Sequence, residues 1–175
     1  EEEEAHLKKL LEASVIEPST SEWASTVVLV RKKDKGMRWC IDYQQPNAVT
    51  VKDSYPLPKI EECLDTLSGS TQFSALDLNF GYHQLQLAHC DKMKTTFITK
   101  YGLFQYHRLP FGLCNAPSLF QRAMELVLRG LQWDVLLIYL DDILVTGSSF
   151  TEHLKRLREV FGRFRTHKLK LKPRK

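Results

Sequence analysis

Apolar residues recur along this chain at two spacings, and each spacing predicts one kind of element. A period of two predicts a strand, and a period of three to four predicts a helix. Helical spacing indicates an acidic amphipathic helix over Glu1–Ser14 and a short helix over Lys59–Leu67. Another helix begins near Asn115 and ends at Gly130, and Ser149 is placed as the N-cap of a last one.

Strands are expected where β-branched and aromatic residues cluster between turn signals. The polar turn Lys33–Gly36 joins two of them into a hairpin, and Lys100–Gly102 joins two more. The expected strands are Thr26–Arg31, Met37–Tyr43, Gln72–Leu78, Lys94–Thr99, Phe104–Arg108, Val135–Leu140 and Ile143–Thr146. There is no β-α-β rhythm, phosphate-binding glycine loop or internal repeat. The pattern therefore predicts an α+β fold in one continuous unit, with an antiparallel sheet covered by helices on one face.

Composition narrows the class of protein. The chain has 175 residues, 43% of them hydrophobic and 26% charged, which is ordinary for one globular domain. No apolar run approaches the roughly 20 residues that span a bilayer, so no membrane contact is expected. The chain begins with four glutamates rather than a signal peptide or methionine, and it ends in a basic run. We expect a piece of a longer polyprotein, with its four scattered cysteines reduced inside the cell.

Basic residues concentrate at the end of the chain. Residues 155–175 carry ten Lys or Arg against one acid, whereas residues 1–154 carry fifteen bases and twenty acids. A basic end on an acidic body is typical of a protein that binds a polyanion. A solvated basic helix face would give the same pattern, so the charge by itself leaves both interpretations open.

An acidic pair, Asp141-Asp142, interrupts two apolar runs. An exposed turn is the simpler explanation of such a pair. Asp77 lies 64 residues before Asp141 in another strand-like setting, and a tight turn at the pair would let all three carboxylates converge. Burying unpaired like charges is unfavourable, and a divalent cation with oxygen ligands relieves the repulsion. The three aspartates therefore predict a site for two-metal phosphoryl transfer.

Seven segments in order give the chain a resemblance to the polymerases of retroviruses and gypsy-type LTR retrotransposons over nearly its whole length. They are Val28-Leu-Val-Arg-Lys-Lys-Asp34, Arg38-Trp-Cys-Ile-Asp-Tyr43, Tyr55-Pro-Leu-Pro58, Leu76-Asp-Leu78, Gly81-Tyr-His-Gln84, Leu109-Pro-Phe-Gly-Leu-Cys-Asn-Ala-Pro117 with Phe120-Gln121, and Tyr139-Leu-Asp-Asp142. The resemblance implies a right-handed polymerase palm with a fingers subdomain and without a thumb. It places residues 1–71 mainly in the fingers, 72–154 mainly in the palm with a fingers insertion near 88–112, and 155–175 in a palm helix and the link to the thumb.

The same resemblance implies an RNA-directed DNA polymerase that uses two Mg²⁺ ions, with Mn²⁺ as a substitute. Its partners would be dNTPs, a primer on an RNA or DNA template, and the thumb, connection and ribonuclease H parts of the parent protein. The expected location is intracellular, in a cytoplasmic virus-like particle or in the nucleus.

Individual roles follow from the matching motifs. Asp77, Asp141 and Asp142 would be catalytic metal ligands, and Leu78 would add a backbone carbonyl. The nucleotide site would comprise Lys32, Arg38, Phe80, Gly81, Tyr82 and Phe111. Template and primer would contact Asn115, Pro117, Gln121, Tyr139, Leu140 and Lys172. Lys and Arg chemistry suits phosphate, and an aromatic ring at Tyr82 would exclude a ribose 2′-hydroxyl. A solvated hairpin for Lys32 and Arg38, and a core position for Tyr82, are the structural alternatives.

Three positions depart from the gypsy-type pattern. Gln44 replaces an arginine, Pro46 replaces an apolar residue, and Phe80 replaces a serine. These departures favour a second hypothesis, a decayed retroelement copy that binds only nucleic acid or protein, whereas the intact aspartates oppose it. A third hypothesis is a viral RNA-dependent RNA polymerase, against which Tyr82 and the Leu109–Gly112 segment argue.

Overall fold

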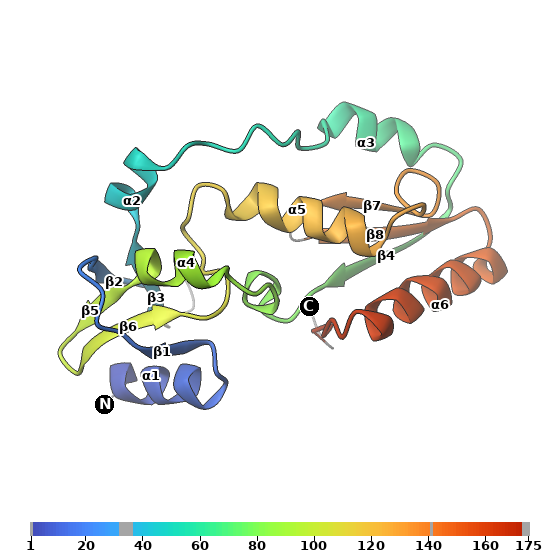
Figure 1. Cartoon of the computed structure of the whole chain (residues 1–175). Helices are drawn as coiled ribbons and strands as arrows, with labels where there is room; N and C mark the ends of the chain where they lie inside the picture. Colours follow the sequence, from blue (N-terminus) through green and yellow to red (C-terminus); the bar gives the residue numbers. More distant parts are fainter. Residues whose placement is uncertain (1, 32–36, 141, 173–175) are drawn as a thin grey trace. The chain divides into compact units, whose positions relative to one another are not determined.

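The chain folds into two compact units, each built from two separate stretches of the sequence. The computed structural model describes residues 2–31, 37–140 and 142–172 (Figure 1). One unit contains residues 1–52 and 82–116, and the other contains residues 53–81 and 117–175. No helix in the described part of the chain is long and apolar enough to cross a membrane. The boundaries of fingers and palm that we expected from the sequence stay a prediction.

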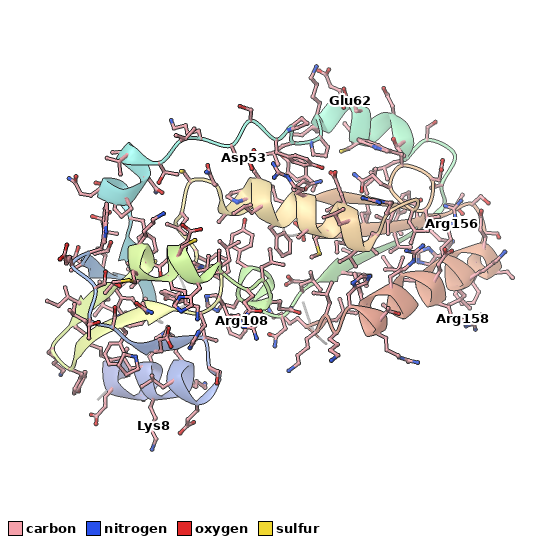
Figure 2. The ribbon with its side chains drawn as sticks, in the orientation of Figure 1. Lys8, Asp53, Glu62, Arg108, Arg156 and Arg158 are labelled. Carbon is pink, nitrogen blue, oxygen red and sulfur yellow. The ribbon has the colours of Figure 1, made fainter. Side chains whose placement is uncertain are left out.

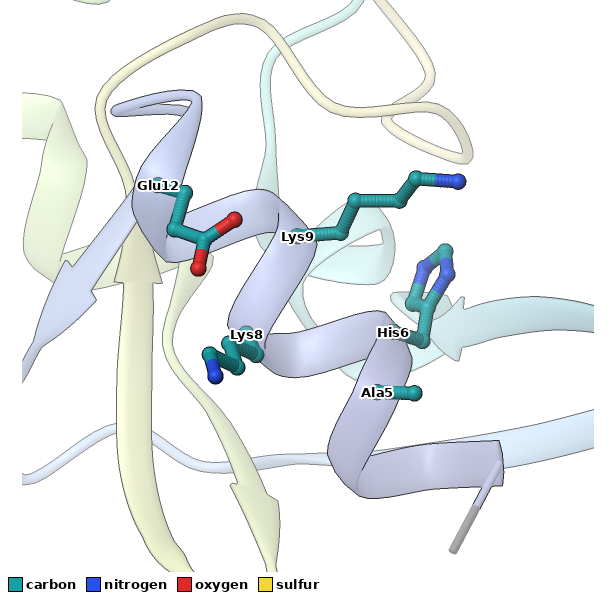
Figure 3. A pocket seen from close by; sticks show the side chains of 5 residues that line it. All are labelled: Ala5, His6, Lys8, Lys9 and Glu12. Carbon is teal, nitrogen blue, oxygen red and sulfur yellow. The ribbon is translucent and has the colours of Figure 1, made fainter.

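The first unit is built on a five-stranded sheet with the strand order β1-β6-β5-β2-β3. Its strands are β1 (Ile16–Pro18), β2 (Ser25–Arg31), β3 (Met37–Asp42), β5 (Phe97–Thr99) and β6 (Gly102–Tyr106). The β2–β3 and β5–β6 hairpins confirm two predictions from the turn signals, whereas the β2–β5 pair is parallel. Helix α1 (Glu2–Glu12) buries Leu7 in a core with Ile16, Phe97, Phe104 and Tyr106. Lys9 and His6 project from the same side of α1 (Figure 3).

Short elements of this unit were not expected from the sequence. They are β1, α2 (Gln44–Val49), η1 (Gly81–Gln84, whose first residue belongs to the other unit), α4 (His89–Lys92) and η2 (Met93–Thr95). Pro46, one of the three departures from the gypsy-type pattern, is the third residue of α2. The first backbone N–H groups of a helix have no partner within it, so Pro46 removes no hydrogen bond there.

The second unit is built on a three-stranded antiparallel sheet with the order β4-β8-β7 (Figure 1). Its elements are α3 (Ile60–Thr66), β4 (Gln72–Asp77), α5 (Ala116–Val127, whose first residue belongs to the other unit), β7 (Leu136–Tyr139), β8 (Asp142–Gly147) and α6 (Phe150–Thr166). One sheet face carries Leu136, Ile138, Ile143 and Val145, all at most 1% exposed. The expected α+β fold with helices against an antiparallel sheet is confirmed.

Helix α6 packs on that buried face through its own apolar stripe, Val160 and Phe164. The Ser149 hydroxyl accepts a hydrogen bond from the backbone N–H of Glu152 at 3.3 Å, which confirms the predicted N-cap. The Glu152 carboxylate in turn accepts from the backbone N–H of Ser148 at 2.9 Å. His153 reaches the hydroxyl of Ser74 on β4 at 2.8 Å. The capping residues therefore fix the point where α6 begins to cover the sheet.

Candidate active site

The β7–β8 hairpin brings Asp142 to the end of the central strand of its sheet. Tyr139 pairs with Asp142, and only Leu140 and Asp141 stand between these two residues in the sequence. Leu140 has a φ of +53°, in the left-handed region that two-residue hairpin turns require. Asp141 lies outside the described residues. The left-handed φ of Leu140 and the pairing of Tyr139 with Asp142 agree with the tight turn that we expected at the acidic pair.

Asp77 lies directly opposite Asp142. The antiparallel β4–β8 register pairs these two residues, and partners in an antiparallel pair project from the same sheet face. Asp77 is separated from Asp142 by 65 positions in the sequence, yet the two residues lie at the same end of the sheet. Two of the three aspartates that the sequence singled out are therefore brought together.

The positively charged side chain of Lys172 lies at this end of the sheet. The ammonium of Lys172 lies 3.7 Å from a carboxylate oxygen of Asp77, and its backbone N–H donates to the Asp77 carbonyl at 2.9 Å. Leu171 bridges Leu78, whose side chain is buried. The segment after α6 thus extends the sheet beyond β4 and carries a basic residue to the aspartates. The Lys172–Asp77 pair is partly exposed, so it contributes little to stability.

The donor set fits a divalent cation. Opposed carboxylates repel each other, and hard cations such as Mg²⁺ bind carboxylate oxygens and keep several water ligands. Among the residues described, no group of three His, Cys, Asp or Glu side chains forms a metal site. Asp141, the third ligand expected from the sequence, lies outside the described residues. Asp77 and Asp142 therefore supply two carboxylates that could bind a cation, and Asp141 precedes Asp142 in the sequence.

Gln121 takes a position that we did not expect. Its side chain is fully buried on α5, so it has no surface with which to contact a template, and that prediction is corrected. Its amide nitrogen donates to the Ile138 carbonyl at 3.1 Å and to Glu125 at 2.8 Å, and its amide oxygen accepts from the Leu140 N–H at 3.1 Å. The sequence did hold a signal: Gln121 shares helical spacing with Met124 and Leu128, both fully buried. A polar residue on an apolar stripe predicts a buried hydrogen-bond network.

The residues expected around the nucleotide fall in both units, and each group has its own local geometry. Tyr82 is 8% exposed, and its ring centroid lies 4.8 Å from that of Phe111, which is half-exposed. His83 lies 5.4 Å from Phe111, and burial lowers the pKa of His83 to about 4, with His6 adding to the effect. Tyr82 and Phe111 therefore share one aromatic cluster, and their role at a nucleotide stays a prediction.

Phe80 and Gly81 belong to the second unit. Phe80 is 67% exposed with a φ of +49°. A Cβ on Gly81 would stand 3.0 Å from the Phe120 ring, so the glycine lets the chain pass close under α5. Lys32 and the side chain of Arg38 lie outside the described part. The backbone of Arg38 pairs with Val30 in the β2–β3 hairpin.

Asn47 organises the loop that holds Phe111, and our sequence analysis gave it no role. Its amide nitrogen donates to the Gly112 carbonyl at 2.8 Å, and its amide oxygen accepts from the Cys114 N–H at 2.8 Å. Asn115 donates to the Val51 carbonyl at 2.9 Å, and Pro117 lies in the first turn of α5. Asn47 follows directly after the departures from the family pattern at Gln44 and Pro46. Its side chain still binds the loop around Phe111 through Gly112 and Cys114.

Comparison with known proteins identifies the family. The family described as "Reverse transcriptase (RNA-dependent DNA polymerase)" matches residues 30–175. The retrovirus-related Pol polyprotein from transposon 412 of Drosophila melanogaster is 41% identical over the whole chain, which spans 15% of that relative. The Pol polyprotein from transposon gypsy of the same organism is 37% identical over 86% of the chain, again 15% of the relative.

Solved structures show the same fold. The foamy viral protease-reverse transcriptase in complex with RNA/DNA hybrid superposes with a TM-score of 0.82 and 25% identity, covering 90% of this chain and 21% of that one. The family match, the similar relatives and the similar solved structure all point to the same family. This chain belongs to the reverse transcriptase family, and the relatives that it matches include retrotransposon Pol polyproteins.

Proposed function

We propose that the chain is the fingers and palm portion of an RNA-directed DNA polymerase that extends a primer by two-metal phosphoryl transfer. The observation that supports this most directly is the register that places Asp77 opposite Asp142 at the mouth of the β7–β8 turn. Both carboxylates project from one face, and Asp141 is next to Asp142 in the chain. The RNA/DNA hybrid in the similar foamy viral complex supports a nucleic-acid substrate of this kind.

The aspartates and Leu78 would hold the metal. When bound, two Mg²⁺ or Mn²⁺ ions would activate the primer 3′-hydroxyl and stabilise the leaving pyrophosphate. Asp77 and Asp142 would act as ligands rather than as acids or bases, and the strand pairing keeps their spacing fixed. Lys172, 3.7 Å from Asp77, adds a positive charge that would attract phosphate.

The nucleotide would be selected in the first unit. The Tyr82 ring packs against Phe111 and is thereby held in place, which suits a group that excludes a 2′-hydroxyl by its bulk. dNTPs would then be preferred to rNTPs. Lys32 and Arg38 would bind the triphosphate, and this remains a proposal from the family motif.

The exposed ring of Phe80 favours a second candidate, a binding module that has lost catalysis. The other two departures do not add structural support, because α2 accommodates Gln44 and Pro46 without losing a hydrogen bond.

A primer-extension assay separates these functions. A labelled DNA primer on an RNA template is incubated with Mg²⁺ and either dNTPs or rNTPs, using a longer version of the protein that continues into the thumb. Asp142→Asn should abolish extension with dNTPs, while Asp134→Asn, an exposed acid in the loop before β7, should leave it intact. Extension with rNTPs alone would identify an RNA polymerase. Template binding without any extension would favour the decayed module and refute the polymerase.

A further inference from the structure

A chain of polar contacts begins at the turn between β7 and β8 and runs through α5. Gln121 bonds to the β7 side of that turn: it donates to the Ile138 carbonyl at 3.1 Å and accepts from the Leu140 N–H at 3.1 Å. Its amide therefore bridges the last part of β7 and the first residue of the turn. Its second N–H donates to Glu125, one helical turn further along α5, at 2.8 Å.

The contacts continue from Glu125 to the segment before α3. The Tyr55 hydroxyl donates to the other carboxylate oxygen of Glu125, and this hydrogen bond is the main cause that raises the pKa of the Tyr55 phenol. The Arg122 guanidinium stacks over the Tyr55 ring, 4.6 Å from its centroid. Arg122 also binds both carboxylate oxygens of Asp53, at 3.0 and 2.8 Å. Figure 2 shows Asp53 on the extended segment that precedes α3.

The turn needs such support for two reasons. Leu140 adopts a left-handed φ of +53°, which a residue with a Cβ rarely adopts unless its surroundings hold it. Beyond the turn, Asp142 stands opposite Asp77, and their repulsion favours separation of the strand ends whenever no cation is bound. A hydrogen bond to the Leu140 N–H opposes both tendencies at the residue beside the acidic pair.

A packing role alone does not account for Gln121. Its neighbours on the same stripe, Met124 and Leu128, are apolar and fully buried, and an apolar side chain would fill the space at no desolvation cost. Both of its amide N–H groups and its oxygen instead have partners, and two of the three partners belong to the hairpin.

We propose that Gln121 is a positioning residue for the aspartate hairpin, and that the Asp53–Tyr55 segment acts on the hairpin through Arg122 and Glu125. The proposal rests on the proposed function in so far as the hairpin carries metal ligands. Gln121 touches neither substrate nor metal. It holds the end of β7 and Leu140 in the conformation that leads into Asp142, and the distal contacts hold the Gln121 amide in orientation.

Two variants test this on the chain as it stands. Gln121→Met keeps the length of the side chain and removes all three hydrogen bonds. Tyr55→Phe removes only the distal hydroxyl, on a half-buried residue outside the core. Met124→Leu, a volume-conserving change at a buried position one turn away on α5, is the matched control.

The first measurement is hydrogen exchange at the Leu140 amide, followed by ¹⁵N NMR. Loss of one buried hydrogen bond should speed exchange about tenfold in Gln121→Met and about threefold in Tyr55→Phe, with Met124→Leu unchanged. The second measurement is Mn²⁺ binding, followed by the EPR signal of the free ion. The dissociation constant should rise by about the same factors, because the ligands are no longer held in place.

Each outcome decides the matter. Unchanged exchange at Leu140 and unchanged Mn²⁺ affinity in a folded Gln121→Met would overturn the proposal. If Tyr55→Phe leaves both the Leu140 exchange rate and the Mn²⁺ affinity as in the unaltered chain, the role of the Asp53–Tyr55 segment is overturned. If Gln121→Met fails to fold, the same result with Tyr55→Phe overturns the proposal. If the unaltered chain binds no Mn²⁺, the proposed metal centre fails, whereas the Leu140 exchange rates still test the positioning role.

Discussion

The close approach of β8 and α6 at Gly147 gives a sharp test of how this unit is packed. A Cβ placed on Gly147 would lie 2.8 Å from the Cβ of His153, 2.9 Å from its Cα and 3.0 Å from its backbone nitrogen. All three contacts are shorter than van der Waals contact. Two of the three atoms belong to the backbone of α6, so no rotamer change can relieve them.

Gly147→Ala should therefore push the first turn of α6 away from β8. Overpacking typically costs about 1–3 kcal/mol, and we expect the upper end because the obstacle is helix backbone. In a chain of this size, each kcal/mol lowers Tm by about 2–4 °C, so a fall of roughly 6–12 °C follows. The same movement would weaken the 2.8 Å contact between His153 and Ser74, which ties α6 to β4.

Thermal and urea unfolding followed by circular dichroism measure this effect. Gly162→Ala is the control, because no atom beyond the adjoining backbone of its own helix lies within 4 Å of its added Cβ and the site is inside α6. That change should stabilise the chain by up to about 1 kcal/mol through helix propensity. Equal Tm values for the two alanine variants would refute the packing described for α6.

Two further changes probe the first unit. His83 is held neutral by burial, with a pKa of about 4 against about 6.5 when unfolded, so the stability it contributes is complete above pH 6.5 and is lost as the pH falls towards 4. His83→Phe should remove on the order of 3 kcal/mol of this acid destabilisation, and urea midpoints that fall as steeply between pH 7 and pH 4 as in the unaltered chain would contradict it. Tyr43 is 2% exposed and donates to the Thr95 carbonyl at 2.9 Å, so Tyr43→Phe should cost about 1–2 kcal/mol in urea unfolding. An unchanged midpoint would mean that this buried carbonyl finds another donor.

Local patterns in the sequence were sufficient for most individual elements. The turn residues Lys100–Gly102 predicted the β5–β6 hairpin, and the spacing from Ser149 to Glu152 predicted the start of α6. These features depend on contacts between residues close in the chain, where turn geometry and capping leave few alternatives. The seven ordered motifs also established the family, which the comparisons confirm.

Other elements could not be predicted because their partners are distant. Strand β1 is three residues long and exists through its pairing with β6, some 90 positions later. The parallel pairing of β2 with β5 likewise joins segments about 70 positions apart. Isolated short strands have little intrinsic preference, so such pairings follow from packing of the whole unit.

The candidate site divides in the same way. The sequence by itself determined which residue types are present and predicted the chemistry: three aspartates in apolar settings, with a tight turn at the Asp141-Asp142 pair. Only the tertiary structure decided that Asp77 stands opposite Asp142, because a register shift of one residue would have turned one carboxylate to the other face. It also decided that Gln121 is buried and forms hydrogen bonds with Ile138 and Leu140 of the hairpin. Residue type fixes what a side chain can bind, whereas long-range strand register and burial fix which side chains meet.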